Sequence, residues 1–123
     1  MITGRVNADL EALVRLTVRG RGSRQRQVDA VVDTGFTGYL TLRPATITAL
    51  QLTWLGREQG TLADGSVDLF DVYRATVIWD GQPRLVEVEA ADVDALVGMA
   101  LLERHSLTIE VRSGGTVSIK PLP

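Results

Sequence analysis

The stretch that decides the fold runs from residue 28 to residue 42 and reads VDAVVDTGFTGYLTL. Val28, Ala30 and Val32 alternate with other side chains at the period of a half-buried strand. Asp33-Thr34-Gly35 ends that strand, because Asp and Thr side chains bond nearby backbone amides and Gly accepts positive φ. A second apolar run follows from Tyr39. The sequence therefore predicts a carboxylate held in a tight loop between two apolar segments.

The composition is that of one ordinary globular domain, which we place at residues 1–123. Hydrophobic residues make up 45% of the chain and charged residues 23%, so a folded core is expected. Thirteen basic residues stand against 15 acidic ones, for a net charge of −2. This balance gives no general reason to expect nucleic acid or an anionic surface as a partner.

The chain has no cysteine, which excludes disulfides, thiolate zinc sites and cysteine nucleophiles. Residues 1–11 lack the apolar core of a signal peptide. The longest uncharged stretch lies between Arg43 and Arg57 and is too short and too polar to span a bilayer. We expect a soluble cytoplasmic protein without a membrane partner.

Alternating apolar residues and regularly spaced turns predict a mostly β chain. Residues 12–32 read as one hairpin that delivers Asp33 at its end, and residues 51–79 as a longer hairpin that turns at 63–66. Residues 44–50 suit a short helix that begins with Pro, and residues 99–104 one or two further helical turns. We expect a closed or sandwich-like β-barrel with one long hairpin and one or two short helices.

The other candidate residues do not form a recognisable catalytic or metal-binding site. His105 is the single histidine, which cannot build a histidine-based metal site and is interpreted as a surface or capping residue. Asp92 and Asp94 lack the further oxygen ligands and the glycine of a calcium loop, so we interpret them as solvated. Five arginines between residues 15 and 26 are interpreted as a solvated strand face, although a nucleic-acid-binding barrel stays open as a minor alternative.

Four features in order carry a resemblance to a known family. An apolar strand leads into Asp33-Thr34-Gly35, an apolar run leads out, a small-tipped hairpin follows about thirty residues later, and Leu96-Val97-Gly98 precedes a short helix. This order resembles the retropepsin-like aspartic peptidases, the single-lobe group that includes the retroviral proteases. Phe36 after the motif is most similar to a bacterial and archaeal branch of that group. The resemblance spans nearly the whole chain.

The resemblance implies a single-lobe closed β-barrel, no cofactor, no metal, and an extended peptide or protein as substrate. It implies that Asp33, Thr34 and Gly35 form the catalytic loop, with Thr34 gripping the loop of a second subunit. The hairpin tip becomes a flap over the substrate, and the terminal strands become part of a dimer contact. Its peptide-binding residues in this chain are Phe36, Thr37, Ala63, Asp64, Gly65, Ser66, Leu96, Val97 and Gly98.

The chemistry of the motif requires two carboxyl groups. Amide hydrolysis by water needs one group to remove a proton from water and another to protonate the carbonyl oxygen. Two carboxyls that share one proton do both. The chain has one Asp-Thr-Gly and no Asp-Ser-Gly, so a catalytic Asp33 must pair with Asp33 of a second copy in a C2 homodimer.

One alternative keeps the fold and loses the reaction. Phe36 is larger than the small residue that retroviral enzymes carry after the motif, and it would crowd the floor of the cleft or narrow its specificity. The chain would then be a dimeric β module that binds an extended peptide, for example by strand addition.

Overall fold

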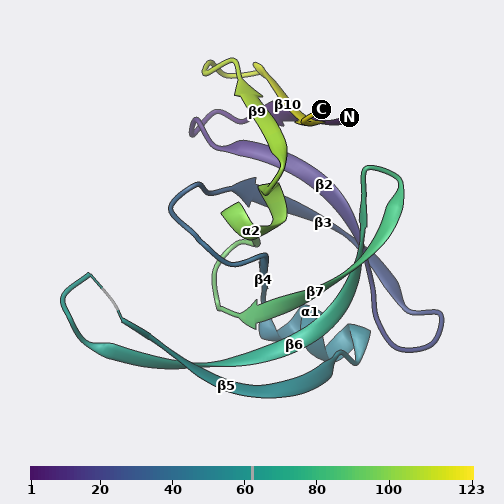
Figure 1. Ribbon diagram of the computed structural model, residues 1–123, viewed down its shortest axis with the longest axis vertical. Helices are drawn as coiled ribbons and strands as arrows, with labels where there is room; N and C mark the ends of the chain where they lie inside the picture. The colour runs from purple at the N-terminus through teal and green to yellow at the C-terminus, as the bar shows by residue number, and fades with distance from the viewer. Residues whose placement is uncertain (62) are drawn as a thin grey trace.

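The computed structural model describes residues 1–61 and 63–123 and contains a mixed sheet of ten strands with two short helices in that part of the chain. The elements follow the chain in the order β1 (Ile2–Val6), β2 (Ala12–Arg19), β3 (Gln25–Val32), β4 (Leu40–Leu42), α1 (Pro44–Leu50), β5 (Thr53–Thr61), β6 (Val67–Trp79), β7 (Gln82–Ala90), β8 (Leu96–Val97), α2 (Met99–Leu102), β9 (His105–Ile109) and β10 (Thr116–Pro121). Figure 1 shows β5 and β6 as a long curved arm that leaves the body of the molecule.

Six strands close into a ring. The sheet order β5-β6-β7-β4-β8-β3-β2-β1-β10-β9 is completed by an additional pairing between β6 and β2. The ring therefore contains β6, β7, β4, β8, β3 and β2, with β5 outside it on one side and β1, β10 and β9 on the other. Within it β3 pairs with β8 and β4 with β7 in parallel, and the other pairings are antiparallel. The mostly β closed barrel predicted from the sequence is confirmed.

The interior of the ring is aliphatic. The strand β2 shows why: Ala12, Val14, Leu16 and Val18 are buried, while the residues between them are exposed or half-buried. The helix α1 covers one end of the barrel with Ile47 and Leu50. Burial of such side chains at about 25 cal/mol per Å² is the main stabilising contribution to the barrel.

The predicted hairpins are present, with small differences at their turns. Residues 12–32 form the β2–β3 hairpin, with pairs from Leu13 and Val31 to Arg19 and Gln25. The turn between β6 and β7 is tight, because Trp79 pairs with Gln82 across Asp80-Gly81. Both turn residues have positive φ, 51° and 80°, as a two-residue hairpin turn of this hand requires.

Candidate active site

The loop after β3 is anchored to β8 at its first residue. The amide of Asp33 donates a hydrogen bond to the carbonyl of Val97 at 2.9 Å, and the amide of Val31 donates to that of Ala95 at 2.8 Å. These bonds continue the parallel pairing of Val32 with Val97. Asp33 is thereby fixed at the point where a central strand leaves the sheet, and its side chain is half-buried.

The carboxylate of Asp33 is oriented by its own loop. Its Oδ1 accepts a hydrogen bond from the amide of Gly35 at 2.9 Å, and its carbonyl oxygen accepts one from the amide of Phe36 at 3.2 Å. This is the local side-chain bonding that makes Asp favourable at a strand exit. Thr34 and Gly35 are exposed at the tip of the loop. Within the described residues Oδ2 makes no hydrogen bond, which leaves it available to a water or a second carboxyl.

The strand β8 is threaded between the two strands that flank this loop. It pairs in parallel with β3 and antiparallel with β4, where Leu40 faces Val97. The start of α2 then binds the far side of the loop: the amides of Gly98, Met99 and Ala100 donate to the carbonyls of Tyr39, Phe36 and Gly38 at 3.0, 2.8 and 3.1 Å. The loop is therefore bonded to β8 and the start of α2 at both of its ends, while its tip at Thr34 and Gly35 is exposed.

A buried hydroxyl also helps to hold β8 in its place between β3 and β4. Thr41 is the one polar or charged side chain among the described residues that is buried, and its Oγ1 accepts a hydrogen bond from the amide of Leu96 at 2.9 Å. Thr41 was not among the site residues predicted from the sequence. The signal that was available is a threonine between Leu40 and Leu42 in an apolar run, because a buried hydroxyl needs a partner.

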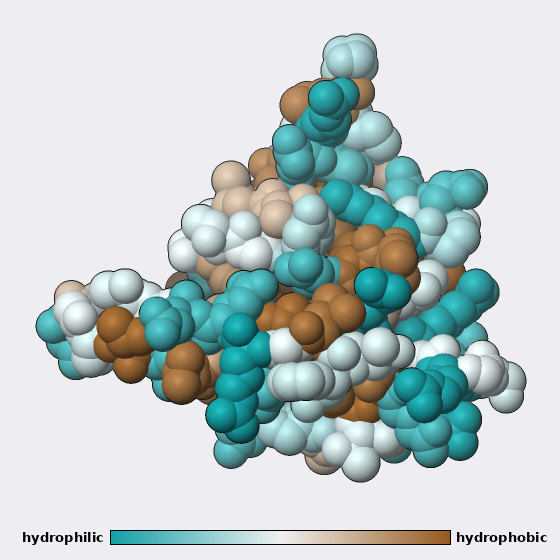
Figure 2. Space-filling view, turned by 60° about the horizontal axis from the view of Figure 1, so that its bottom comes forward, coloured by the Kyte–Doolittle hydropathy of each residue, from teal (hydrophilic) through white to brown (hydrophobic). Residues whose placement is uncertain are grey.

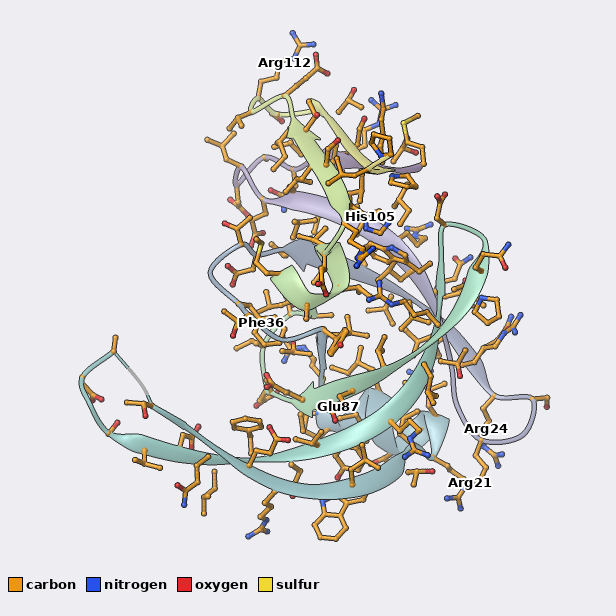
Figure 3. The ribbon with its side chains drawn as sticks, in the orientation of Figure 1. Arg21, Arg24, Phe36, Glu87, His105 and Arg112 are labelled. Carbon is orange, nitrogen blue, oxygen red and sulfur yellow. The ribbon has the colours of Figure 1, made fainter. Side chains whose placement is uncertain are left out.

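The ring of Phe36 lies over two glycines. A Cβ on Gly38 would stand 2.6 Å from Cζ of Phe36, and a Cβ on Gly98 would stand 2.5 Å from its Cδ2. Both positions must therefore lack a side chain for the ring to lie where it does. Figure 3 shows Phe36 in the loop that leads toward β4, next to α2. The absence of side chains at Gly38 and Gly98 therefore makes room for the large ring of Phe36.

The flap predicted around residues 63–66 is the tip of the β5–β6 arm. The ladder ends at the pair Thr61 and Val67, so the connection is longer than a two-residue turn, and Leu62 lies outside the described residues. Asp64 organises the rest of the tip, since its Oδ1 accepts from the hydroxyl of Ser66 at 2.6 Å and from its amide at 2.9 Å. These bonds lower the pKa of the Asp64 carboxyl. Gly65 takes a φ of 84°.

The structure brings most of the predicted site residues together, and leaves one group apart. The loop residues Asp33 to Phe36 and the crossing segment Leu96 to Gly98 form one hydrogen-bonded unit, with Thr37 exposed beside it. The described tip residues from Ala63 onward stand on the separate arm, on the same side of the molecule as the loop (Figure 1). Their roles in binding or catalysis stay predictions.

The two minor candidates have structural partners. The Nε2 of His105 accepts a hydrogen bond from Nε1 of Trp79 at 3.2 Å, and its Nδ1 lies 2.8 Å from the carbonyl oxygen of Glu103. Arg43 donates to both acidic residues of the loop between β7 and β8, Asp92 and Asp94, at 3.1 Å each. These contacts give the histidine and the two carboxylates structural roles.

No helix in residues 1–61 and 63–123 has the length and apolar character needed to cross a membrane. No family model matches the chain. No curated protein matches it either.

Solved structures match the fold. A retropepsin-like aspartic protease from Rickettsia conorii aligns with a TM-score of 0.59 and 14% identity, over 97% of this chain and 89% of that one. EIAV protease in complex with the inhibitor HBY-793 aligns with a TM-score of 0.57 and 17% identity, over 79% and 89% of the two chains. A foamy viral protease-reverse transcriptase aligns with a TM-score of 0.51 and 18% identity, over 73% of this chain and 11% of that longer one. The chain has the retropepsin-like fold.

Proposed function

We propose that this chain is a homodimeric aspartic endopeptidase in which Asp33 of each subunit activates one water molecule. The observation that carries the proposal is the carboxylate of Asp33, which stands at the exit of a central strand with one oxygen held by the amide of Gly35. The retropepsin-like fold supports it, because the solved structures that share this fold are described as proteases.

The reaction needs two carboxyl groups that share one proton. In the proposed dimer the ionised carboxyl takes a proton from water as the water oxygen bonds to the peptide carbonyl carbon. The protonated carboxyl gives its proton to the carbonyl oxygen, and the resulting diol collapses as the nitrogen is protonated and leaves. Because two like charges a few ångströms apart repel, the pair keeps one proton. In each subunit Oδ2 of Asp33 is the oxygen left free for this exchange.

The second carboxyl comes from a second copy of the chain. The strand pairing supports a contact at β9. In the described part of the chain β1 is bonded to β2 and β10, and β10 to β1 and β9, so both edges of each terminal strand are filled. β9 pairs with β10 alone and has an open edge. It also follows α2, whose amides hold the Asp33 loop.

Antiparallel pairing of β9 with its copy fits a two-fold axis, since identical strands that run in opposite directions are related by C2 symmetry. We therefore place the intersubunit contact at the open edge of β9, and not at the edges of the terminal strands β1 and β10.

The substrate is proposed to be an extended peptide under the flap. Val67 and Leu69 of the arm are 61% and 57% exposed, and Leu55 at its base is 40% exposed. Figure 2 shows apolar atoms along this arm and on the adjoining body of the molecule. Exposed apolar side chains on an arm that projects from the body of a protein are typical of a binding surface.

Hydrolysis of a peptide library or casein between about pH 3 and 7, near and above the range in which carboxyl groups titrate, tests the proposal. Wild type is expected to cleave, and Asp33→Asn to lose activity by about 10³-fold, the contribution typical of acid–base groups. Thr34→Ser, which keeps the hydroxyl, is the matched loop variant and is expected to retain activity. Equal turnover by wild type and Asp33→Asn would contradict the proposal.

The second candidate is a dimeric peptide-binding module of the same fold. The exposed apolar arm favours it as much as it favours a protease, since both hold an extended chain. The same assay separates them: binding of an uncleaved peptide by wild type and Asp33→Asn alike would support the module.

A further inference from the structure

A basic groove lies on the side of the barrel away from the Asp33 loop. It has a volume of about 180 Å³ and its lining includes Arg19, Arg21, Arg74, Thr53, Thr76 and Leu85. Figure 3 shows Arg21 and the neighbouring Arg24 at the opposite side of the molecule from Phe36 and the tip of the arm. The groove is therefore separate from the proposed active site.

Four separate segments of the chain line the groove, residues 19–21, 51–53, 74–76 and Leu85. Arg19 ends β2 and lies opposite Thr76 of β6. Arg21 lies in the β2–β3 turn, and its amide donates to the carbonyl of Leu50 at 2.9 Å, which fixes the turn against α1. Arg74 lies on β6 opposite Thr53. The backbone of the groove is thus held by the sheet and by α1.

No described carboxylate pairs with the guanidinium groups of this groove. The ion pairs among the described side chains that use arginine involve Arg15, Arg43 and Arg57. Arg19, Arg21 and Arg74 make none within 4 Å, and Glu87, the cross-strand neighbour of Arg74, does not reach it. All three arginines are exposed, so their guanidinium groups are open to an anion that approaches from solvent.

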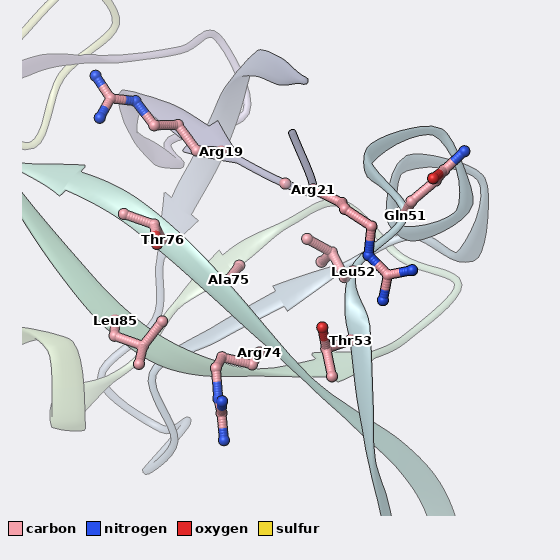
Figure 4. A pocket seen from close by; sticks show the side chains of 10 residues that line it. Arg19, Arg21, Gln51, Leu52, Thr53, Arg74, Ala75, Thr76 and Leu85 are labelled. Atoms are coloured by element: carbon pink, nitrogen blue, oxygen red, sulfur yellow. The ribbon is translucent and has the colours of Figure 1, made fainter. Parts of the chain in front are cut away.

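The directions of these side chains indicate an extended anion. Figure 4 shows the three arginines extending to different sides of the groove, with Arg21 and Arg74 on either side of Thr53. One phosphate group would need donors that converge, whereas charges spaced along a chain meet donors that are spread out. Leu85 adds an apolar rim that is 63% exposed. The lining contains no aromatic residue on which nucleic-acid bases would stack.

We propose that this groove binds an acidic segment of a protein partner, with carboxylates of the segment on Arg19, Arg21 and Arg74 and an apolar side chain against Leu85. Arg pairs with carboxylates through two parallel hydrogen bonds, which gives such a contact geometric specificity. The chain as a whole has a net charge of −2, so the attraction is local to the groove and not a general property of the protein.

Binding of a fluorescein-labelled pentapeptide with four glutamates around one leucine tests this proposal, measured by fluorescence anisotropy on the full chain carrying Asp33→Asn. The double variant Arg21→Glu/Arg74→Glu is expected to raise Kd at least about tenfold, because attraction becomes repulsion. The matched control is Arg112→Glu/Lys120→Glu, which makes the same charge change at exposed positions elsewhere (Figure 3 shows Arg112 at the far end) and is expected to change Kd less than about twofold.

Arg21→Gln/Arg74→Gln, a milder pair, is expected to weaken binding with an unchanged thermal unfolding curve, which separates loss of contact from loss of fold. Equal weakening by the control pair would overturn the proposal, because it would make the attraction non-specific. Tighter binding of tripolyphosphate or of a ten-residue oligothymidylate than of the peptide would also overturn it, in favour of a phosphate or nucleic-acid site. Each readout is independent of proteolysis.

Discussion

At the scale of single residues, Phe36 and two glycines form one packing unit in the loop of Asp33. The nearest atoms that a Cβ on Gly38 would meet all belong to the Phe36 ring, whereas a Cβ on Gly98 would also meet the backbone carbonyls of Gly38 and Phe36. The two glycines are therefore required for different reasons. The first makes room for a side chain, and the second makes room for the loop itself.

This difference predicts a double-mutant cycle. Gly38→Ala is expected to lower the free energy of unfolding by about 1–3 kcal/mol in wild type, the usual cost of overpacking. In a Phe36→Ala background the same substitution is expected to cost almost nothing. Gly98→Ala serves as the control, because its backbone contacts make it costly in both backgrounds. Urea denaturation measures the cycle, and an equal cost of Gly38→Ala in the two backgrounds would contradict it.

Glu89 gives a pH dependence with a defined sign. Burial raises the pKa of its carboxyl, and the charges of Glu58 and Glu87 raise it further. Its contribution to stability is therefore full below the unfolded pKa and is lost as pH rises through the folded pKa. Glu89→Gln is expected to raise the free energy of unfolding at about pH 7, by no more than a few tenths of a kcal/mol because solvent screens this partly exposed carboxyl, and to change it little at about pH 4.

Glu110 is the control for Glu89, since the hydroxyl and amide of Thr116 lower the pKa of the Glu110 carboxyl. Its favourable contribution is present above the unfolded pKa and is lost as pH falls through the folded pKa. Glu110→Gln is therefore expected to destabilise the fold at about pH 7, the opposite sign. Thermal unfolding at the two pH values measures both variants, and a stabilising Glu110→Gln would refute this assignment.

At the scale of elements, the two-residue strand β8 joins the halves of the site. It is bonded to β3 on one side and to β4 on the other, and the amide of its first residue, Leu96, donates a hydrogen bond to the hydroxyl of Thr41. Thr41→Val keeps the shape of the side chain and removes that acceptor. Thr41→Val is expected to lower the free energy of unfolding by about 1–3 kcal/mol, the cost of leaving a buried amide without a hydrogen-bond partner.

Thr41→Ser keeps the acceptor and is the matched variant for this prediction. Thr41→Ser is expected to lower the free energy of unfolding by less than Thr41→Val does, because it removes only a methyl group. Urea denaturation compares the two. A Thr41→Val protein as stable as wild type would show that the hydroxyl bond contributes nothing to the crossing.

The open edge of β9 carries a prediction about assembly. Thr108 is an exposed residue of this strand, and in a two-fold pair each copy places it near the other β9. Thr108→Asp is expected to raise the dimer dissociation constant by about tenfold, because like charges are then brought together across the axis. Thr3→Asp, on the doubly paired strand β1, is the control and is expected to leave association unchanged. Sedimentation velocity measures both, and dissociation by Thr3→Asp alone would move the contact elsewhere.

Local patterns predicted the elements well where a period or a turn residue marks them. The alternation in residues 12–32 and Pro44 at the start of the short helix are examples, and both segments have the expected bounds. The position of Asp33 at a strand exit followed from its neighbours in sequence. The crossing of β8 did not, because two residues carry no period and their partners lie about 60 positions away. The basic groove escaped prediction for the same reason, since Arg74 joins Arg19 and Arg21 only in the folded chain.

At the scale of the whole molecule, the ring of strands presents one carboxylate in a loop that is bonded to β8 and to the start of α2, and this carboxylate is half of the proposed site. The proposal therefore requires that activity belong to pairs of subunits. A chain that worked alone would need a second acid close to Asp33. Among the described residues the one hydrogen bond to the Asp33 carboxylate comes from the amide of Gly35, so no second acid is bonded to it, and Asp64 lies in the arm between β5 and β6.

Subunit mixing tests this requirement most directly. Wild type and Asp33→Asn are mixed at constant total concentration, unfolded and refolded together, and assayed for peptide hydrolysis. If a dimer needs both carboxyls, the remaining activity is proportional to the square of the wild-type fraction, because only dimers of two wild-type chains are active. An equal mixture is therefore expected to retain about a quarter of the wild-type rate. A rate of about half, proportional to the wild-type chains present, would show that each chain acts alone and would contradict the shared site.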